Sequence, residues 1–260
     1  VARRADSHKG ENGKVAVIGG SRTMHGAPLF AALAAEASGV DLLYVCVPRC
    51  HEEVAKSSCL NFQVHPFAGD ALASKDRKPI LELLATMDSA VLGPGIDHAD
   101  TQSVQVLLDI VAEASCSLVL DAAALQSDTL EKVQGKQAVL TPHLGELERM
   151  GLRPEDLEAS ASSSGAVLFL KGPTDIIASP GGDVQRLEGG HAGLTVGGTG
   201  DALAGLIAGL MAQEVSPFDA ARKAGSVMKR AATDLFEDVG FSLTTMDVIK
   251  RIPRLLEPQQ

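Results

Sequence analysis

Aromatic side chains are scarce in this chain of 260 residues, which has no tryptophan and a single tyrosine, Tyr44. Platforms for single-stranded nucleic acid stack bases on aromatic rings, so this scarcity argues against such a platform. Basic residues are also few: 23 Lys and Arg stand against 33 Asp and Glu, a formal net charge of −10. A surface of this sign opposes binding to a phosphate backbone, and any anionic ligand needs a local device such as a helix N-terminus.

Cysteines are few as well, and none of the four forms a C-x-x-C pair. Cys46, Cys50, His51 and Cys59 lie close in sequence, but zinc sites usually carry two ligand pairs at short fixed spacings. We therefore expect reduced thiols, with Cys46 buried in a strand. Residues 1–13 lack the apolar stretch of a signal peptide, and no apolar run reaches the roughly 18 residues of a membrane helix. The expected location is the cytoplasm.

Short β-rich runs alternate along the chain with longer runs rich in Ala and Leu. This alternation predicts a three-layer α/β/α fold, with a mainly parallel sheet and helices on both faces, in one domain over residues 1–260. One antiparallel hairpin is expected where strands 175–178 and 183–187 flank a Ser-Pro-Gly-Gly turn. The Ser-rich stretch 160–165 is expected to be a loop. The other expected strands are 14–19, 41–47, 61–67, 90–92, 117–121, 138–141 and 166–170, and the expected helices are 27–38, 75–87, 101–114, 146–150, 199–213, 217–237 and 244–256.

Several common nucleotide and hydrolase motifs are missing from the sequence. No G-x-x-x-x-G-K-[ST] occurs, which argues against a P-loop enzyme, and Gly93-Pro94-Gly95 lacks the third glycine of a dinucleotide fingerprint. Neither H-E-x-x-H nor G-x-S-x-G is present, so standard zinc proteases and serine hydrolases are not indicated.

Glycines cluster in Gly197-Gly198-Thr199-Gly200-Asp201, directly before a strong helical pattern. Backbone N–H groups at such a turn, together with the positive end of the helix dipole, form an anion site. A carboxylate beside that site has the wrong charge to bind phosphate. As a general base, however, Asp201 could take a proton from a hydroxyl that attacks phosphorus. The alternative is an Asp201 that merely caps the helix.

This segment resembles the anion hole and catalytic Asp of ribokinase-like small-molecule kinases. The ordered set of motifs between about Ser7 and Gly209 is similar to that of the ADP/ATP-dependent NAD(P)H-hydrate dehydratases. The motifs are Ser7-His8-Lys9-Gly10, Gly13-Lys14-Val15, Val17-Ile18-Gly19-Gly20-Ser21, Ser21-x-x-Met24-x-Gly26-Ala27-Pro28, Gly93-Pro94-Gly95, Leu120-Asp121-Ala122, Leu140-Thr141-Pro142-His143-x-Gly145-Glu146 and Leu170-Lys171-Gly172.

The resemblance implies a ribokinase-like fold and an enzyme that repairs hydrated NADH and NADPH. Such enzymes use ATP or ADP to phosphorylate the hydroxyl on the damaged nicotinamide ring, and loss of phosphate regenerates the cofactor. It also implies site roles. Asp201 is the base and contacts the substrate, which Ala27, Gly95 and His143 also contact. The stretch Lys171, Gly172, Pro173, Thr174 and Asp175 borders the adenine nucleotide, and Gly197, Gly198, Thr199 and Gly200 form the phosphate cradle.

A magnesium role through water is implied for Glu146, because related kinases place a glutamate there. Mg²⁺ keeps much of its water, so one carboxylate and the nucleotide phosphates suffice to hold it. Plainer roles stay open from the residues alone. Ala27 and Gly95 could be small only for packing, and His143 could be a surface residue. Glu146 could serve only the dipole of its helix, and Lys171 could simply be solvated.

Two departures from the family pattern stand out. Ala123 replaces the second carboxylate of an Asp-Ala-Asp-Ala-Leu segment, which weakens the expectation of an acidic group from this loop, and Leu194 stands where Met is frequent, a tolerable packing change. The epimerase domain that many relatives carry at their N-terminus is not expected here. Family habit and Ala-rich helices favour a homo-oligomer, a tetramer among the candidates.

Two other functions stay open. A kinase of the same fold, acting on a vitamin precursor or sugar alcohol, predicts a stable phosphorylated product. A nucleotide-binding sensor predicts binding without turnover. The sequence does not decide whether ATP or ADP is the phosphate donor, or whether the substrate is NADH hydrate or NADPH hydrate. It also does not decide whether a monovalent cation assists the reaction.

Overall fold

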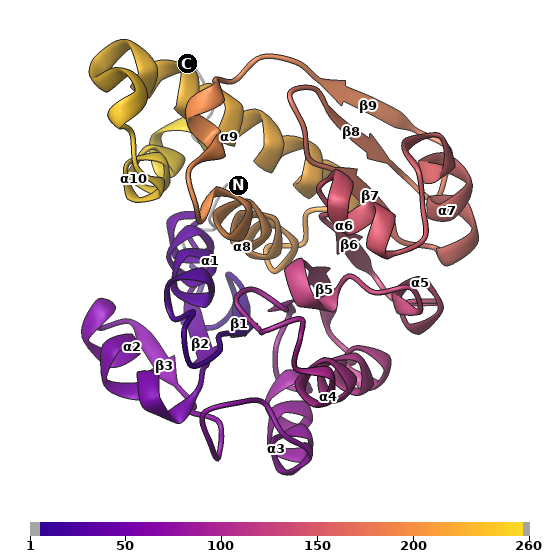
Figure 1. Ribbon diagram of the computed structural model, residues 1–260. Coiled ribbons are helices and arrows are strands. Elements are labelled where there is room, and N and C mark those ends of the chain that lie inside the picture. Colours follow the sequence, from indigo (N-terminus) through magenta and orange to yellow (C-terminus); the bar gives the residue numbers. More distant parts are fainter. Residues whose placement is uncertain (1–5, 257–260) are drawn as a thin grey trace.

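The computed structural model describes residues 6–256, which build one nine-stranded sheet between two layers of helices (Figure 1). Residues 1–5 of the polar N-terminal stretch and residues 257–260 lie outside this description. The strand order is β3-β2-β1-β4-β5-β6-β7-β8-β9, parallel through β7 and antiparallel from β7 to β9. The strands are β1 (Lys14–Ile18), β2 (Leu42–Cys46), β3 (Phe62–Val64), β4 (Ser89–Leu92), β5 (Ser117–Leu120), β6 (Ala138–Leu140), β7 (Val167–Leu170), β8 (Asp175–Ala178) and β9 (Val184–Leu187).

Two separate cores lie on the two faces of the sheet, because neighbouring side chains of a strand point to opposite faces. In β1, Val15 and Val17 enter one core while Ala16 and Ile18 enter the other. Helices covering the first face are α1 (Gly26–Ala37), α2 (Glu52–Ser58), α8 (Thr199–Met211), α9 (Pro217–Val239) and α10 (Thr245–Leu256). Helices covering the second are α3 (Ser74–Leu84), α4 (Thr101–Glu113), α5 (Thr129–Lys132), α6 (Leu144–Arg149) and α7 (Leu157–Ser164).

Helices α1 and α8 approach each other at backbone distance. A Cβ atom on Gly205 of α8 would lie 1.9 Å from the carbonyl oxygen of Ala31 in α1, and one on Gly209 would lie 2.2 Å from Ser38 Oγ. Only glycine fits at this crossing, and the facing surface of α1 is built largely from alanine. The close contact holds α8 against the sheet, with its N-terminus at the carboxyl edge of the parallel strands (Figure 1).

The predicted α/β/α layering, the parallel strands and the antiparallel β8–β9 hairpin are confirmed. The expected loop over 160–165 is wrong, because α7 runs to Ser164. The Ser164 hydroxyl donates to the Ser160 carbonyl at 2.6 Å, so the buried hydroxyl finds its hydrogen-bond partner within the helix itself. Helix α2 was not predicted, and β3 is shorter than the expected strand 61–67. Among residues 6–256, no helix is long and apolar enough to cross a bilayer.

Substitution Gly205→Ala should lower the free energy of unfolding by about 2–3 kcal/mol, because the added methyl overpacks the α1–α8 crossing. Urea unfolding measures the change. Gly69→Ala is the matched control, since the nearest heavy atom to its added Cβ is Lys75 Nζ at 4.0 Å, and we expect a change within about 0.5 kcal/mol. Equal stabilities of G205A and wild type would show that the two helices can move apart freely.

Candidate active site

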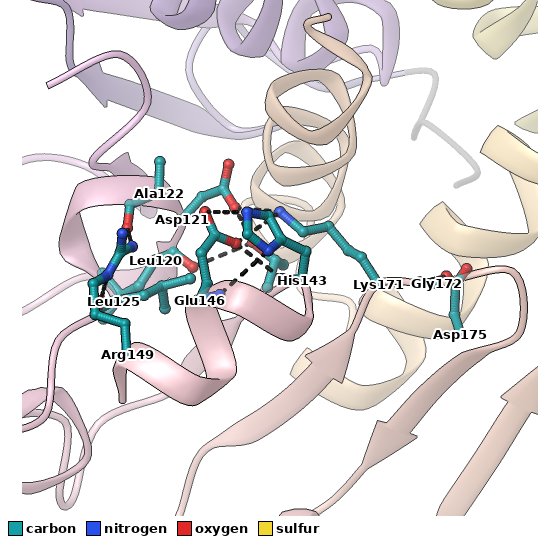
Figure 2. Close-up of polar contacts among 11 residues, drawn as sticks. Leu120, Asp121, Ala122, Leu125, His143, Glu146, Arg149, Lys171, Gly172 and Asp175 are labelled. Carbon is teal, nitrogen blue, oxygen red and sulfur yellow. Dashed lines mark hydrogen bonds and ion pairs between the residues drawn. The ribbon is translucent and has the colours of Figure 1, made fainter. Parts of the chain in front are cut away.

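Three polar residues follow three adjacent parallel strands and meet at the carboxyl edge of the sheet. Asp121 follows β5, Thr141 follows β6 and Lys171 follows β7. One oxygen of Asp121, Oδ1, accepts from Thr141 Oγ1 at 2.8 Å and lies 2.8 Å from Lys171 Nζ (Figure 2). The Asp121 side chain is 4% exposed and that of Lys171 19%. Lys171 is therefore a partly buried partner in an ion pair, and the solvated alternative is wrong.

Glu146 and His143 form the N-terminal cap of α6. The Glu146 backbone N–H donates to His143 Nδ1 at 3.2 Å, and the His143 N–H donates to Glu146 Oε2 at 2.9 Å. Because Nδ1 accepts a hydrogen bond, the proton of the neutral imidazole is assigned to Nε2, which lies 3.5 Å from Glu146 Oε1. Glu146 Oε2 also lies 3.4 Å from Lys171 Nζ, so this residue serves both its helix and the ion cluster (Figure 2).

Asp201 brings a third carboxylate to the cluster from the first turn of α8. The N-cap of this helix is Gly198 and it makes no side-chain cap bond, so the capping alternative for Asp201 is wrong. Within residues 6–256, no hydrogen-bond donor reaches the Asp201 carboxylate. Burial raises the pKa of Asp201 to about 7; Asp121 and Glu146 also raise it, and Lys171 lowers it. Near neutral pH this unpaired carboxyl can therefore both accept and release a proton.

Lys171 is the cation that all three carboxylates share. Burial lowers the pKa of its ammonium, but attraction by Asp121 and Glu146 outweighs burial and raises the pKa above its ordinary value. Three carboxylates around one ammonium leave two negative charges uncompensated when Asp201 is ionised. In the described part of the chain, no three His, Cys, Asp or Glu side chains converge closely enough to ligate a metal directly.

The glycine segment forms a tight turn over helix α1 immediately before α8. Gly198 has φ +99°, and a Cβ there would lie 2.5 Å from the Phe30 ring of α1. A Cβ on Gly200 would lie 3.4 Å from Lys171 Nζ, which places the first turn of α8 beside the ammonium. Thr199 Oγ1 donates to the Leu194 carbonyl at 2.7 Å, and the buried Thr245 of α10 donates to the Gly197 carbonyl at 2.8 Å.

A second group of small residues lies where β1 and β4 end. Gly95 has φ +72°, and a Cβ there would lie 3.0 Å from Ala27 Cβ, so the structure brings these two predicted residues together. A Cβ on Gly93 would lie 2.0 Å from the Asp121 carbonyl, which links this turn to the ion cluster. The Ser21 hydroxyl nearby is buried and has no partner among the described residues. Buried polar atoms normally have partners, so this hydroxyl is a candidate ligand contact.

The stretch 171–175, predicted to border the nucleotide, contains both exposed and buried residues. Gly172, Pro173 and Thr174 are exposed on the loop between β7 and β8, whereas Asp175 is buried. Burial raises the pKa of Asp175, although its carboxylate accepts from the Gly172 N–H at 2.9 Å and lies 3.3 Å from Lys229 Nζ. The stretch is therefore an exposed loop held at its base by charged contacts.

Of the predicted site residues, the structure gathers four into one cluster: His143, Glu146, Lys171 and Asp201. Sequence reasoning assigned no role to Asp121 and expected little acidity from its loop. Ala123 is buried, but Asp121 alone supplies the acidic group of this loop. An Asp directly after a buried parallel strand could have signalled this. Sequence reasoning also missed Thr141, Lys229 and Thr245. For Lys229 there was a signal, because a lysine stands on the otherwise apolar, alanine-rich face of α9.

Comparison with known proteins shows which sequences and structures this chain resembles. The family model described as NAD(P)H-hydrate dehydratase matches residues 15–254. The ADP-dependent (S)-NAD(P)H-hydrate dehydratase of Cenarchaeum symbiosum is 36% identical, with 99% of this chain and 93% of the relative covered. The Bacillus subtilis ADP/ATP-dependent NAD(P)H-hydrate dehydratase, co-crystallized with ATP/Mg²⁺, has a TM-score of 0.81 at 29% identity and covers 98% of this chain and 92% of its own. Ribokinase from Thermotoga maritima shares the fold, with a TM-score of 0.61 at 10% identity over 94% of this chain and 99% of its own.

Substitution Lys171→Met should lower the free energy of unfolding by about 3 kcal/mol at pH 8, because it leaves the carboxylates without their cation. The loss should be smaller at pH 5, where protonation of Asp201 relieves the repulsion. Urea unfolding at both pH values measures it. Lys78→Met removes an exposed lysine and should change stability by less than about 0.5 kcal/mol. An equal loss for K171M at both pH values would contradict the repulsion between carboxylates.

Proposed function

This chain belongs to the NAD(P)H-hydrate dehydratase family, and we propose that it uses an adenine nucleotide to dehydrate the hydrated forms of NADH and NADPH. The observation that supports this most is the Asp201 carboxylate. It lies in the first turn of α8, beside the glycine turn, with no hydrogen-bond donor among residues 6–256 and a pKa raised to about 7. The proposal covers the described residues as one catalytic domain.

The chemistry begins at the hydroxyl of the hydrated nicotinamide ring. Asp201 accepts the hydroxyl proton as the oxygen attacks the terminal phosphorus of the nucleotide, and the shortened nucleotide leaves with the bonding pair. The ring C–O bond of the phosphate ester then breaks. Phosphate leaves with that electron pair, and loss of a proton from the neighbouring ring carbon restores the double bond. A carboxylate with a pKa near 7 suits the first step because it accepts a proton at neutral pH.

The transferred phosphoryl group is proposed to lie against the glycine turn. Gly197, Gly198, Thr199 and Gly200 precede or begin α8, whose free N–H groups and positive dipole end favour an anion. The Lys171 ammonium lies beside Gly200 and adds positive charge. The N–H groups at the start of α8 are the local feature that attracts phosphate in a chain whose overall charge is negative.

Magnesium fits the site as an ion held by nucleotide phosphates and water. When bound, Mg²⁺ neutralises charge on the transferring phosphate. The uncompensated negative charge around Lys171 favours a divalent cation nearby. Both oxygens of Glu146 already face protein donors, which suits contact through water rather than direct ligation.

The hydrated dinucleotide is proposed to extend from Asp201 toward the turn at Gly95. Ala27 and Gly95 pack closely there, so a longer side chain at Gly95 would not fit, and the unpartnered Ser21 hydroxyl offers a polar contact. His143 borders the cluster from the cap of α6, with its side chain 59% exposed and available to substrate.

We propose two further properties of the whole protein. Its four thiols are free, which suits the reducing cytoplasm. The exposed apolar side chains Leu60 and Phe241 suit burial between copies in a homo-oligomer, with a tetramer as one candidate. Light scattering in solution measures the number of subunits.

Substitution Asp201→Asn should lower turnover at least about a hundredfold, because the amide cannot accept the hydroxyl proton. Nucleotide binding should persist. The assay combines NADH hydrate, Mg²⁺ and ATP or ADP, and follows the near-ultraviolet absorbance of reduced nicotinamide together with phosphate release. Asp183→Asn, in the exposed turn between β8 and β9, is the control and should keep full activity. D201N should be no less stable than wild type at pH 8, since it removes a buried charge.

Full activity of D201N would reject the proposed base. The wild-type enzyme separates the candidate reactions. Nucleotide-dependent recovery of reduced nicotinamide with free phosphate supports the dehydratase, and the better nucleotide identifies the donor. A stable phosphorylated product with another alcohol would instead indicate a kinase.

The rate constant kcat/KM should rise with pH through about 7 and then level off, because Asp201 is an active base only when ionised. Below this midpoint each pH unit should cost about tenfold in rate. Lys171 lowers the pKa of Asp201, so any activity left in K171M should show its midpoint at higher pH. A flat profile between pH 5 and 8 would contradict the assignment of Asp201 as base.

A further inference from the structure

Lys229 is a buried lysine outside the ion cluster. It lies midway along α9, on a helix face that is otherwise apolar and rich in alanine, and the residue is 7% exposed. A buried ammonium without partners costs several kcal/mol, so its surroundings must supply oxygen atoms.

Four oxygens surround the Lys229 Nζ atom. The carbonyl of Pro173 lies at 3.0 Å, that of Gly189 at 3.2 Å and that of Gly172 at 3.5 Å, and Asp175 Oδ2 lies at 3.3 Å. An ammonium has three N–H donors, so four oxygens at similar distances surround it as a shell surrounds a spherical ion. Three carbonyls and one carboxylate carry a single negative charge, which one monovalent cation balances.

The two backbone segments that meet at Lys229 both lead to the proposed nucleotide site. Gly172 and Pro173 belong to the loop that directly follows Lys171. Gly189 and Gly190 begin the stretch that ends at the glycine turn. Gly190 has φ +82°, and a Cβ there would lie 3.0 Å from Lys229 Cγ, so this backbone packs on the lysine stem. Without the cation, the carbonyls of the two segments would face each other unpaired.

We propose that Lys229 is a positioning residue whose ammonium acts as a built-in monovalent cation, holding together the two loops that border the nucleotide. The inference rests on the proposed nucleotide site. The wild-type enzyme then needs no dissolved cation at this place. Removing the side chain leaves a site of three carbonyls and one carboxylate that accepts K⁺ or NH₄⁺, which are close to the ammonium in size and charge.

The test compares wild type, Lys229→Ala and Lys229→Met in chloride salts of K⁺, NH₄⁺, Na⁺ and N-methylglucamine at equal ionic strength. The alanine variant opens the site, whereas the methionine variant removes the charge but leaves the stem in place. One readout is the unfolding temperature without nucleotide. The other readout is the KM for the nucleotide and the kcat, both measured in the repair assay.

Wild type should behave alike in all four salts. In N-methylglucamine chloride, K229A should show a KM for the nucleotide raised about tenfold, the factor that roughly 1.4 kcal/mol of lost binding produces, with a smaller change in kcat. Ammonium or potassium should restore most of that KM and raise the unfolding temperature of K229A, and sodium should do less. K229M should show the raised KM in every salt, because its stem blocks the site.

Three results would overturn the inference: a wild-type KM that depends on potassium, a folded K229A indifferent to every cation, or a K229A that stays unfolded even in ammonium. The unfolding temperature needs no turnover. Cation-dependent unfolding of K229A in a protein without repair activity would therefore reject the proposed function while leaving the role of Lys229 intact.

Discussion

The site depends on one partly buried ammonium shared by three carboxylates. Lys171 pairs directly with Asp121 and Glu146, and its charge also moderates the pKa of Asp201. If the lysine were absent, the remaining carboxylates would repel one another in a poorly solvated place. If it compensated them fully, the pKa of Asp201 would be lower, although burial, the largest cause of its shift, would still raise it. Burial, together with this incomplete compensation, holds the pKa of Asp201 at about 7, where acid–base catalysis is effective.

Backbone packing brings the elements of this cluster together. The contact of Gly205 with the α1 backbone places α8 over β1, β4 and β5, and its first turn lies beside the ammonium of Lys171, the residue that follows β7. The turn before α8 is itself limited by Phe30, which leaves no room for a side chain at Gly198. Gly198 and Gly205 must therefore both be glycine, because α1 approaches the backbone closely at each position.

The loops around the proposed nucleotide site are held from behind by the two C-terminal helices. Thr245 of α10 bonds the Gly197 carbonyl, and His191 stacks on Phe236 of α9 at a ring-centroid distance of 3.6 Å. Together with the Lys229 contacts, these interactions join α9 and α10 to the stretch between β9 and α8. Substitutions far from the reacting atoms can therefore change nucleotide affinity without touching the ligand.

The layering, the parallel strands, the β8–β9 hairpin and the position of Asp201 in the first turn of a helix all follow from the amino-acid sequence alone. These features depend on short-range patterns, namely apolar periodicity, turn residues and glycine spacing. The charge cluster of Asp121, Glu146 and Lys171, and the four oxygens around Lys229, become evident only when the chain is folded. Those contacts join strands and helices distant in the chain, and charge and burial act through space, which local patterns do not record.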